Sequence, residues 1–235
     1  MFSRVTLKRG LKQEGESPFW ISFSDLMSAL MTLFLVVMAV TLVAVTKNIT
    51  SEEAAKIQRE KDVKAVMSSI RKISEIFKAV RVGESTFRID LGDVVRFDSA
   101  DFAIKPEAAR FLRSYIPVLL TAQASPEGKE WMRRVVVEGF TDQDGSYLYN
   151  LGLSLNRSRS VVCVLFAKTS AEEVALSPEQ KRQIRDLFLV GGYSFNSSKK
   201  EKAESRRVEL KIEFWAIGEK PQSTPISDEK EFGQC

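Results

Sequence analysis

The longest apolar stretch of the chain runs from residue 19 to residue 45 and reads FWISFSDLMSALMTLFLVVMAVTLVAV. Its length is sufficient to cross a bilayer core of roughly 30 Å with some tilt. A cleaved signal peptide has a shorter apolar core and a small-residue cleavage site, which this stretch lacks. We therefore predict a single, uncleaved transmembrane helix over residues 19–45.

Residues 46–81 are charged and have a helical pattern, which predicts a linker helix that Gly83 ends. Apolar residues recur there at alternating spacings of three and four positions, at Val63, Val66, Ile70, Ile73, Phe77 and Val80. This heptad spacing is compatible with a coiled coil between two copies of the chain. It is equally compatible with an amphipathic helix that lies on its own domain, and the sequence leaves both alternatives open.

Residues 82–218 alternate between strand-like and helix-like patterns, which predicts an α/β sandwich with helices packed on a sheet. We expect four strands, at Thr86–Leu91, Val94–Phe97, Arg133–Phe140 and Arg206–Trp215. We expect three helices, at Pro106 to about Gln123, Ser146–Lys168 and Ser177 to about Leu189. Further expected features are a hairpin turn at Gly92-Asp93, a kink at Pro117 and a turn at 125–128. The tail 219–235 has no apolar periodicity, so we expect it to be flexible.

Composition excludes several function classes. The 35 basic and 31 acidic residues of the 235 are mixed, and the net charge is +4, so no nucleic-acid patch is predicted. The chain has no histidine, which argues against zinc sites and hydrolytic triads, and no catalytic constellation is found. The spacing of Cys163 and Cys235 is not typical of a metal site. We expect Cys163 to be a small buried apolar residue, although a disulfide in an oxidising compartment stays open.

Basic residues are distributed unevenly around the apolar stretch. Residues 1–18 hold Arg4, Lys8, Arg9 and Lys12 against two acids, whereas only Lys47 follows the stretch closely. The positive-inside rule therefore predicts a cytoplasmic N-terminal tail over residues 1–18. In a bacterium with an outer membrane, the residues after the helix would then be periplasmic.

One ionisable side chain, Asp25, lies inside the apolar stretch without a basic partner there. A carboxylate at membrane depth costs roughly 2.5–3.5 kcal/mol on insertion scales, so it is usually functional. Ser28 and Thr32 follow at three and seven positions and share its helical stripe. We interpret these three residues as an ion-binding site that needs neighbouring helices for shielding. The alternative is an aspartate at the membrane interface that reaches water.

A second polar pair lies in the α/β region. Asp142 follows the expected buried strand at Gly139-Phe140-Thr141-Asp142, and Arg157 lies fifteen residues further along, inside the next expected helix. The two side chains could form a surface salt bridge. Alternatively, the carboxylate could bind an ammonium group while the guanidinium binds a carboxylate through its bidentate fork, which together would hold a zwitterion.

Two stretches resemble known families. The residues Trp20-x4-Asp25-Leu26-Met27-Ser28 are similar to the transmembrane helix of MotB-type stator subunits, whose aspartate binds an ion. The residues EGFTDQDGSYLYNLGLSLNRSRSVVCVL resemble the signature of OmpA-like peptidoglycan-binding domains. That resemblance implies that Asp142 and Arg157 hold the diaminopimelate of the wall stem peptide, with Thr141 and Asn150 in the same site. Phe140 and Ser158 depart from the family's usual His and Ala.

Together the two resemblances imply a peptidoglycan-anchored stator subunit that works as a homodimer inside a ring of a multi-span MotA-like or ZorA-like partner. The chain is short for a flagellar stator, and its Leu-Met pairs look closer to the ZorB family of Zorya anti-phage systems. The transported ion would be a proton or sodium, with no other cofactor. The alternatives are a flagellar motor stator subunit of the MotB type and a passive anchor between membrane and wall, without transport. The region 169–189 is longer than is usual in OmpA-like domains.

Overall fold

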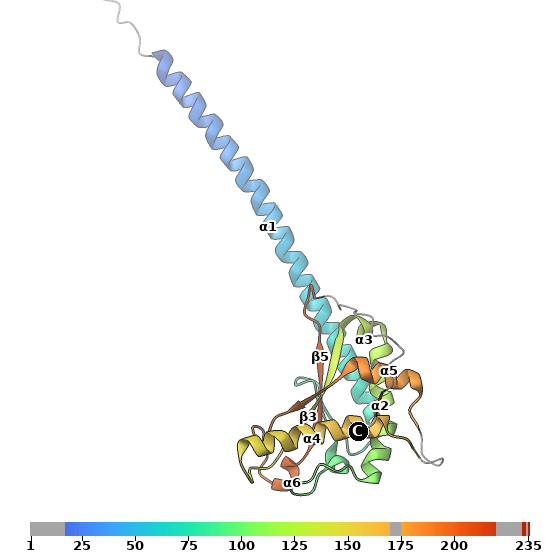
Figure 1. Cartoon of the computed structure of the whole chain (residues 1–235). Coiled ribbons are helices and arrows are strands. Elements are labelled where there is room, and N and C mark those ends of the chain that lie inside the picture. Colours follow the sequence, from blue (N-terminus) through green and yellow to red (C-terminus); the bar gives the residue numbers. More distant parts are fainter. Residues whose placement is uncertain (1–16, 170–174, 220–231, 234) are drawn as a thin grey trace, which may run out of the picture. The chain divides into compact units, whose positions relative to one another are not determined.

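The computed structural model describes residues 17–169, 175–219, 232–233 and 235 of the chain (Figure 1). These residues divide into two compact units, Met1–Ala54 and Ala55–Cys235. Helix α1, Ser17–Ser74, begins in the first unit and ends in the second. Its sequence has neither glycine nor proline after Pro18, so nothing in the sequence interrupts its backbone hydrogen bonds. The expected membrane helix is therefore the N-terminal part of a longer helix. The structure ends α1 at Ser74, nine residues before the expected end at Gly83.

The heptad seam belongs to the second unit. Val63, Val66 and Ile70 are buried there, and Val66 and Ile70 form part of the domain's hydrophobic core. Phe77 and Val80 are half-buried against the same core. Of the two alternatives for this seam, the structure shows the amphipathic helix packed on its own domain. The predicted linker 46–81 is therefore, from Ala55 onward, part of the folded domain.

The domain is built on one five-stranded sheet with the order β1-β2-β5-β3-β4. Its strands are β1 Arg81–Gly83, β2 Arg88–Asp90, β3 Met132–Gly139, β4 Phe188–Gly192 and β5 Val208–Phe214. The pair β3 and β4 is parallel, whereas the other neighbouring pairs are antiparallel. A parallel pair needs a long crossover, which here contains α4 Tyr147–Phe166 and α5 Pro178–Leu187.

The two faces of the sheet differ in chemistry because side chains alternate along each strand. One face carries the fully buried Ile89, Val135, Val137 and Leu210, which form the core with helices α2 (Pro106–Ala124) and α4. The other face is polar: Arg88 forms ion pairs with both Glu138 and Glu209, and Arg134 pairs with Glu213. Helices on one face of a mixed sheet confirm the predicted α/β sandwich (Figure 1).

Several predicted boundaries were wrong. The hairpin pairs β1 with β2, whereas Gly92 to Val95 form the short 3-10 helix η1 instead of a turn and a strand. Gly92 has a φ of 67°, a conformation that L residues with a side chain rarely adopt, and a Cβ there would overlap the carbonyl oxygen of Ala79, so glycine suits this position. The expected turn at 125–128 is the start of helix α3, Pro126–Trp131, which Ser125 caps. The helix expected to reach Leu189 ends at Leu187, and β4 follows directly.

The cysteines also differ from the expectation. Cys163 is half-buried and forms a disulfide with Cys235, with 5.8 Å between their Cα atoms. The last residue of the chain is thereby joined to α4, and Phe232 contacts Phe166 of that helix at 5.0 Å between ring centroids. The predicted flexibility concerns residues 219–235, of which 220–231 and 234 lie outside the described residues.

Candidate functional site

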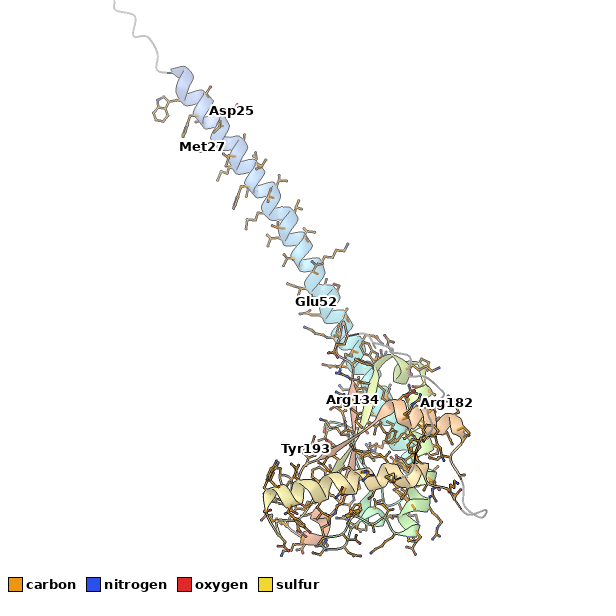
Figure 2. The ribbon with its side chains drawn as sticks, in the orientation of Figure 1. Asp25, Met27, Glu52, Arg134, Arg182 and Tyr193 are labelled. Carbon is orange, nitrogen blue, oxygen red and sulfur yellow. A yellow bond between two sulfur atoms is a disulfide. The ribbon has the colours of Figure 1, made fainter. Side chains whose placement is uncertain are left out.

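The first candidate site lies in the N-terminal unit, on α1. Because residues 25–32 are helical, Asp25, Ser28 and Thr32 share one stripe, as the spacing predicts. All three are exposed in the single chain, and Figure 2 labels Asp25 on this helix. The hydroxyl of Ser28 donates to the carbonyl of Ser24 at 2.7 Å, and that of Thr32 donates to the carbonyl of Ala29 at 2.9 Å. Both hydroxyls are therefore satisfied by their own helix, and each keeps lone pairs that could accept from a ligand.

Apolar side chains surround this stripe and are also exposed. Leu26, Leu30 and Leu33 each keep more than half of their surface accessible. Helix α1 is the one described helix that is long and apolar enough to span a membrane, and no part of its apolar window is buried by the chain. Such a surface is stable only against lipid or another protein.

The second candidate site lies in the domain, where β3 ends. Close approach between the sheet and α4 creates it: a Cβ at Gly139 or at Gly192 would overlap atoms of Ser154, on α4. Asp142 follows β3 and is only 7% exposed. Its Oδ1 accepts from the backbone N–H of Asp144 at 3.2 Å.

The other carboxylate oxygen of Asp142, Oδ2, accepts from Nη1 of Arg206 at 3.0 Å. In the described part of the chain, the ion partner of Asp142 is thus Arg206 and not Arg157. The surface salt bridge considered between Asp142 and Arg157 is not formed.

Arg157 is completely buried. Its three nitrogens donate to main-chain carbonyls: Nε to Asp101 at 2.9 Å, Nη1 to Phe140 at 2.9 Å and Nη2 to Asp98 at 3.1 Å. The guanidinium also lies 5.1 Å from the centroid of the Phe97 ring. Burial lowers the pKa of Arg157 to about 10, and the nearby Asp142 carboxylate opposes this shift. The side chain therefore stays charged at neutral pH.

Thr141 and Asn150 are both buried beside the Asp142 loop. The amide nitrogen of Asn150 donates to the carbonyl of Asp144 at 2.8 Å. Thr141 Oγ1 and Asn150 Oδ1 have no hydrogen-bond partner among the described residues. Unpaired buried polar atoms are costly and uncommon, so two of them in one site indicate an incomplete hydrogen-bond network.

Sequence reasoning gave no role to Arg206. The register of the sheet explains its position: Gly139 pairs with Val208, so the residues before Val208 lie beside those after Gly139. The backbone N–H of Phe140 accordingly donates to the carbonyl of Arg207 at 3.0 Å. The basic pair Arg206-Arg207 before the last strand was the available signal, but its use requires knowing that β5 is the neighbour of β3.

A separate hollow of about 270 Å³ lies beside the disulfide. Asn156, Arg159 and Ser160 of α4 line it together with Cys235. None of the candidate site residues lines this hollow, so we do not assign the chemistry of Asp142 to it.

No protein-family model matches the chain. It is 42% identical to the Zorya protein ZorB of Escherichia coli O139:H28 over 227 residues, which are 96% of this chain and 91% of that protein. Among solved structures, a putative MotB-like protein from Desulfovibrio vulgaris is similar with a TM-score of 0.44 and 15% identity, over 68% of this chain and 97% of that one. The periplasmic domain of Helicobacter pylori MotB is similar with a TM-score of 0.38 and 18% identity, over 56% and 75%.

Proposed function

The chain belongs to the ZorB family of Zorya proteins, and from this premise we propose that it is the wall-anchored subunit of an ion-driven motor in the bacterial inner membrane that acts in anti-phage defence. The observation that carries the proposal is the presence of two kinds of site in one chain. A lone carboxylate lies in an exposed apolar helix, and a separate folded domain holds a charged, partly unsatisfied polar site.

In this proposal Asp25 binds and releases the transported ion, a proton or sodium, with Ser28 and Thr32 on the same stripe as accessory oxygen ligands. Neutralising the carboxylate lowers the cost of placing the stripe against an apolar partner surface, and releasing the ion restores that cost. Each state of Asp25 therefore favours a different packing of α1 against its partner, so an ion gradient can drive a cycle between them. The partner would be a multi-span ring of the ZorA or MotA type that surrounds two copies of α1.

The domain would bind peptidoglycan through the site around Asp142. Its carboxylate suits the ammonium of a diaminopimelate side chain. The unpaired oxygens of Thr141 and Asn150 can accept from the same ammonium, and the Thr141 hydroxyl can alternatively donate to the ligand's carboxylate. A periplasmic location is supported by the basic residues that precede the membrane helix and by the disulfide, since disulfides persist in oxidising compartments.

The test uses cells that carry this gene with its neighbours. We would challenge the wild type, Asp25→Asn and Asp25→Glu with phage, and score swimming in the same strains. Loss of protection in Asp25→Asn with swimming unchanged supports the defence motor, and Asp25→Glu should retain partial protection because it keeps a carboxyl group.

Loss of swimming instead of protection would identify a flagellar stator. Full protection by Asp25→Asn, at a membrane level equal to the wild type, would contradict ion carriage and favour the passive anchor. Thr41→Val on the same helix is the matched control, since the Thr41 hydroxyl donates to the carbonyl of Met38 and lies outside the proposed site.

A further inference from the structure

The disulfide between Cys163 and Cys235 lies at the surface of the domain, where Cys235 is exposed and Cys163 is half-buried. Both cysteines line the hollow of about 270 Å³. The residues that line it with them are Phe102, Ile104, Asn156, Arg159, Ser160 and Val164. Thiol–disulfide exchange requires such access, because the attacking sulfur must reach one of the two bonded sulfurs. A small thiol can therefore approach this bond while the domain stays folded.

Arg159 is the one charged side chain among the residues that line the hollow. It is exposed and has no ion partner or hydrogen bond with another described residue. Arg159 and Cys163 are four positions apart on α4, so their side chains lie on one face of that helix. An arginine beside a cysteine favours the thiolate form of the sulfur. Arg159 is therefore placed to stabilise a negative charge that develops on Cys163.

The position of Cys163 on its helix makes this charge necessary. Cys163 lies in the last turn of α4, which ends at Phe166. The negative end of the helix dipole disfavours a thiolate there, so the helix itself does not prepare Cys163 to leave. Exchange is faster when the leaving sulfur is a stabilised anion. Removal of the guanidinium should therefore slow the opening of the bond.

We propose that the Cys163–Cys235 disulfide is a thiol-exchange site, which a dithiol reductant opens in the folded domain. One thiolate of the reductant attacks Sγ of the exposed Cys235 and forms a bond to it. The bond to Cys163 breaks, and its electron pair leaves with Sγ of Cys163 as a thiolate that Arg159 stabilises. The second thiolate of the reductant then attacks the first and releases Cys235. The reductant ends as an internal disulfide, and the two cysteines gain two electrons and, through solvent, two protons.

Phe232 keeps the released cysteine close to α4. Its ring lies 5.0 Å from the ring of Phe166, measured between the centroids. The two thiols therefore stay at a high effective concentration, and an oxidant can close the bond again. The thiols and oxidants around the protein thus determine whether Cys235 is joined to α4. This inference rests on the disulfide and its surroundings, and it depends neither on ion carriage nor on wall binding.

The experiment follows the reduction of the full-length, oxidised chain in detergent by dithiothreitol at neutral pH. Samples are quenched with an alkylating reagent, and mass spectrometry counts the modified cysteines. We expect a rate that is proportional to the dithiothreitol concentration and that a low, non-denaturing concentration of urea leaves unchanged. A rate that rises with urea, together with the unfolded fraction, would overturn the proposal, because the bond would then open only on unfolding.

Arg159→Gln tests the stabilisation of the leaving sulfur. It should slow reduction about three- to tenfold and leave the Tm of the oxidised protein unchanged, whereas Arg159→Lys should keep most of the wild-type rate because it keeps the charge. Arg110→Gln is the matched control, since Arg110 is exposed on α2 and does not line the hollow. It should react at the wild-type rate. Equal rates for the wild type and Arg159→Gln would refute the role of Arg159.

A second measurement identifies the sulfur that is attacked. Glutathione replaces dithiothreitol, the released thiol is alkylated, and peptide mapping locates both modifications. We expect glutathione on Cys235 and the alkyl group on Cys163, because the exposed sulfur is attacked and the one beside Arg159 leaves. The reverse distribution would contradict the assigned direction of attack.

Discussion

Asp25 and Asp142 carry the same carboxylate group in two regions of the chain, and the two regions give that group different partners. Asp25 lies on α1 with exposed apolar neighbours, and it forms no ion pair with another described residue. Asp142 is buried, accepts from a backbone N–H and is paired with Arg206. The first carboxylate has no ion pair among the described residues, whereas the second is paired within the domain. Substitutions in the domain should therefore change its stability, and Asp25 substitutions should change function alone.

The largest stability effect is expected for Arg157→Ala. It leaves the carbonyls of Asp98, Asp101 and Phe140 without their donor in a buried site. Because unpaired buried groups pay their full desolvation cost, the free energy of unfolding should fall by about 3–5 kcal/mol. Urea unfolding monitored by circular dichroism measures it. The exposed Arg159→Ala on the same helix should stay within about 0.5 kcal/mol, and equal effects of the two variants would contradict the assigned contacts.

Removing the disulfide should have the next largest effect on stability. Cys163 and Cys235 are 72 residues apart, so the bond restricts a long loop in the unfolded chain. Cys163→Ser should lower the free energy of unfolding by about 2–5 kcal/mol, and Cys235→Ser should do the same. Thermal melts with and without a reductant measure this effect. A reductant should shift the wild type to the level of the variants and leave the variants unchanged, and a wild type insensitive to the reductant would show that the bond is absent.

Two glycines near the contact between β3 and α4 should change stability in opposite directions, and by smaller amounts. A methyl group at Gly139 would overlap the carbonyl oxygen of Ser154, so Gly139→Ala should destabilise the domain by about 1–3 kcal/mol. Gly152 lies inside α4 with open space around it, so Gly152→Ala should stabilise by about 0.5–1 kcal/mol. Shifts of the same sign in the two melting curves would refute the close approach of β3 and α4.

The smallest effect concerns the pH dependence of stability. Burial alone would raise the pKa of Asp90, but the N–H of Gly92 and the ammonium of Lys199 outweigh it, so the pKa lies below 3.8. Because the folded value is below the unfolded one, this carboxylate stabilises the fold above pH 3.8, and the gain is lost as the pH falls through the folded pKa. Between about pH 5 and about pH 3, the wild type should therefore lose more stability than Asp90→Asn. Equal losses of stability in the wild type and in Asp90→Asn would contradict the ion pair between Asp90 and Lys199.

The elements that were predicted correctly are those with long, regular patterns and recognisable ends. Helix α4 has the N-cap Ser146, and α5 has a full capping box at Ser177, so both starts could be found from sequence. Strand β3 was visible as a β-branched run. Strand β4 was missed because its residues continue the apolar pattern of α5 and end in Gly191-Gly192, which weakens a strand signal.

The charged site was predicted only in part, for a physical reason. Asp142 and Arg157 carry a local pattern that a known family shares, and the structure brings both to the end of β3. Which cation faces Asp142 depends on the neighbour of β3, and the antiparallel β5 is far away in the sequence. The complete burial of Arg157 likewise depends on loop 97–101, whose packing no local pattern encodes.

The most direct test of the central claim is ion flux through the purified complex of this chain with its multi-span partner in sealed vesicles. A pH-sensitive dye would report proton uptake, and a sodium-sensitive dye would report sodium, for the wild type and for Asp25→Asn at equal reconstitution. We expect flux of one of these ions in the wild type and none in Asp25→Asn, with the domain's melting temperature unchanged. Equal flux in both proteins would contradict the assignment of the transported ion to Asp25.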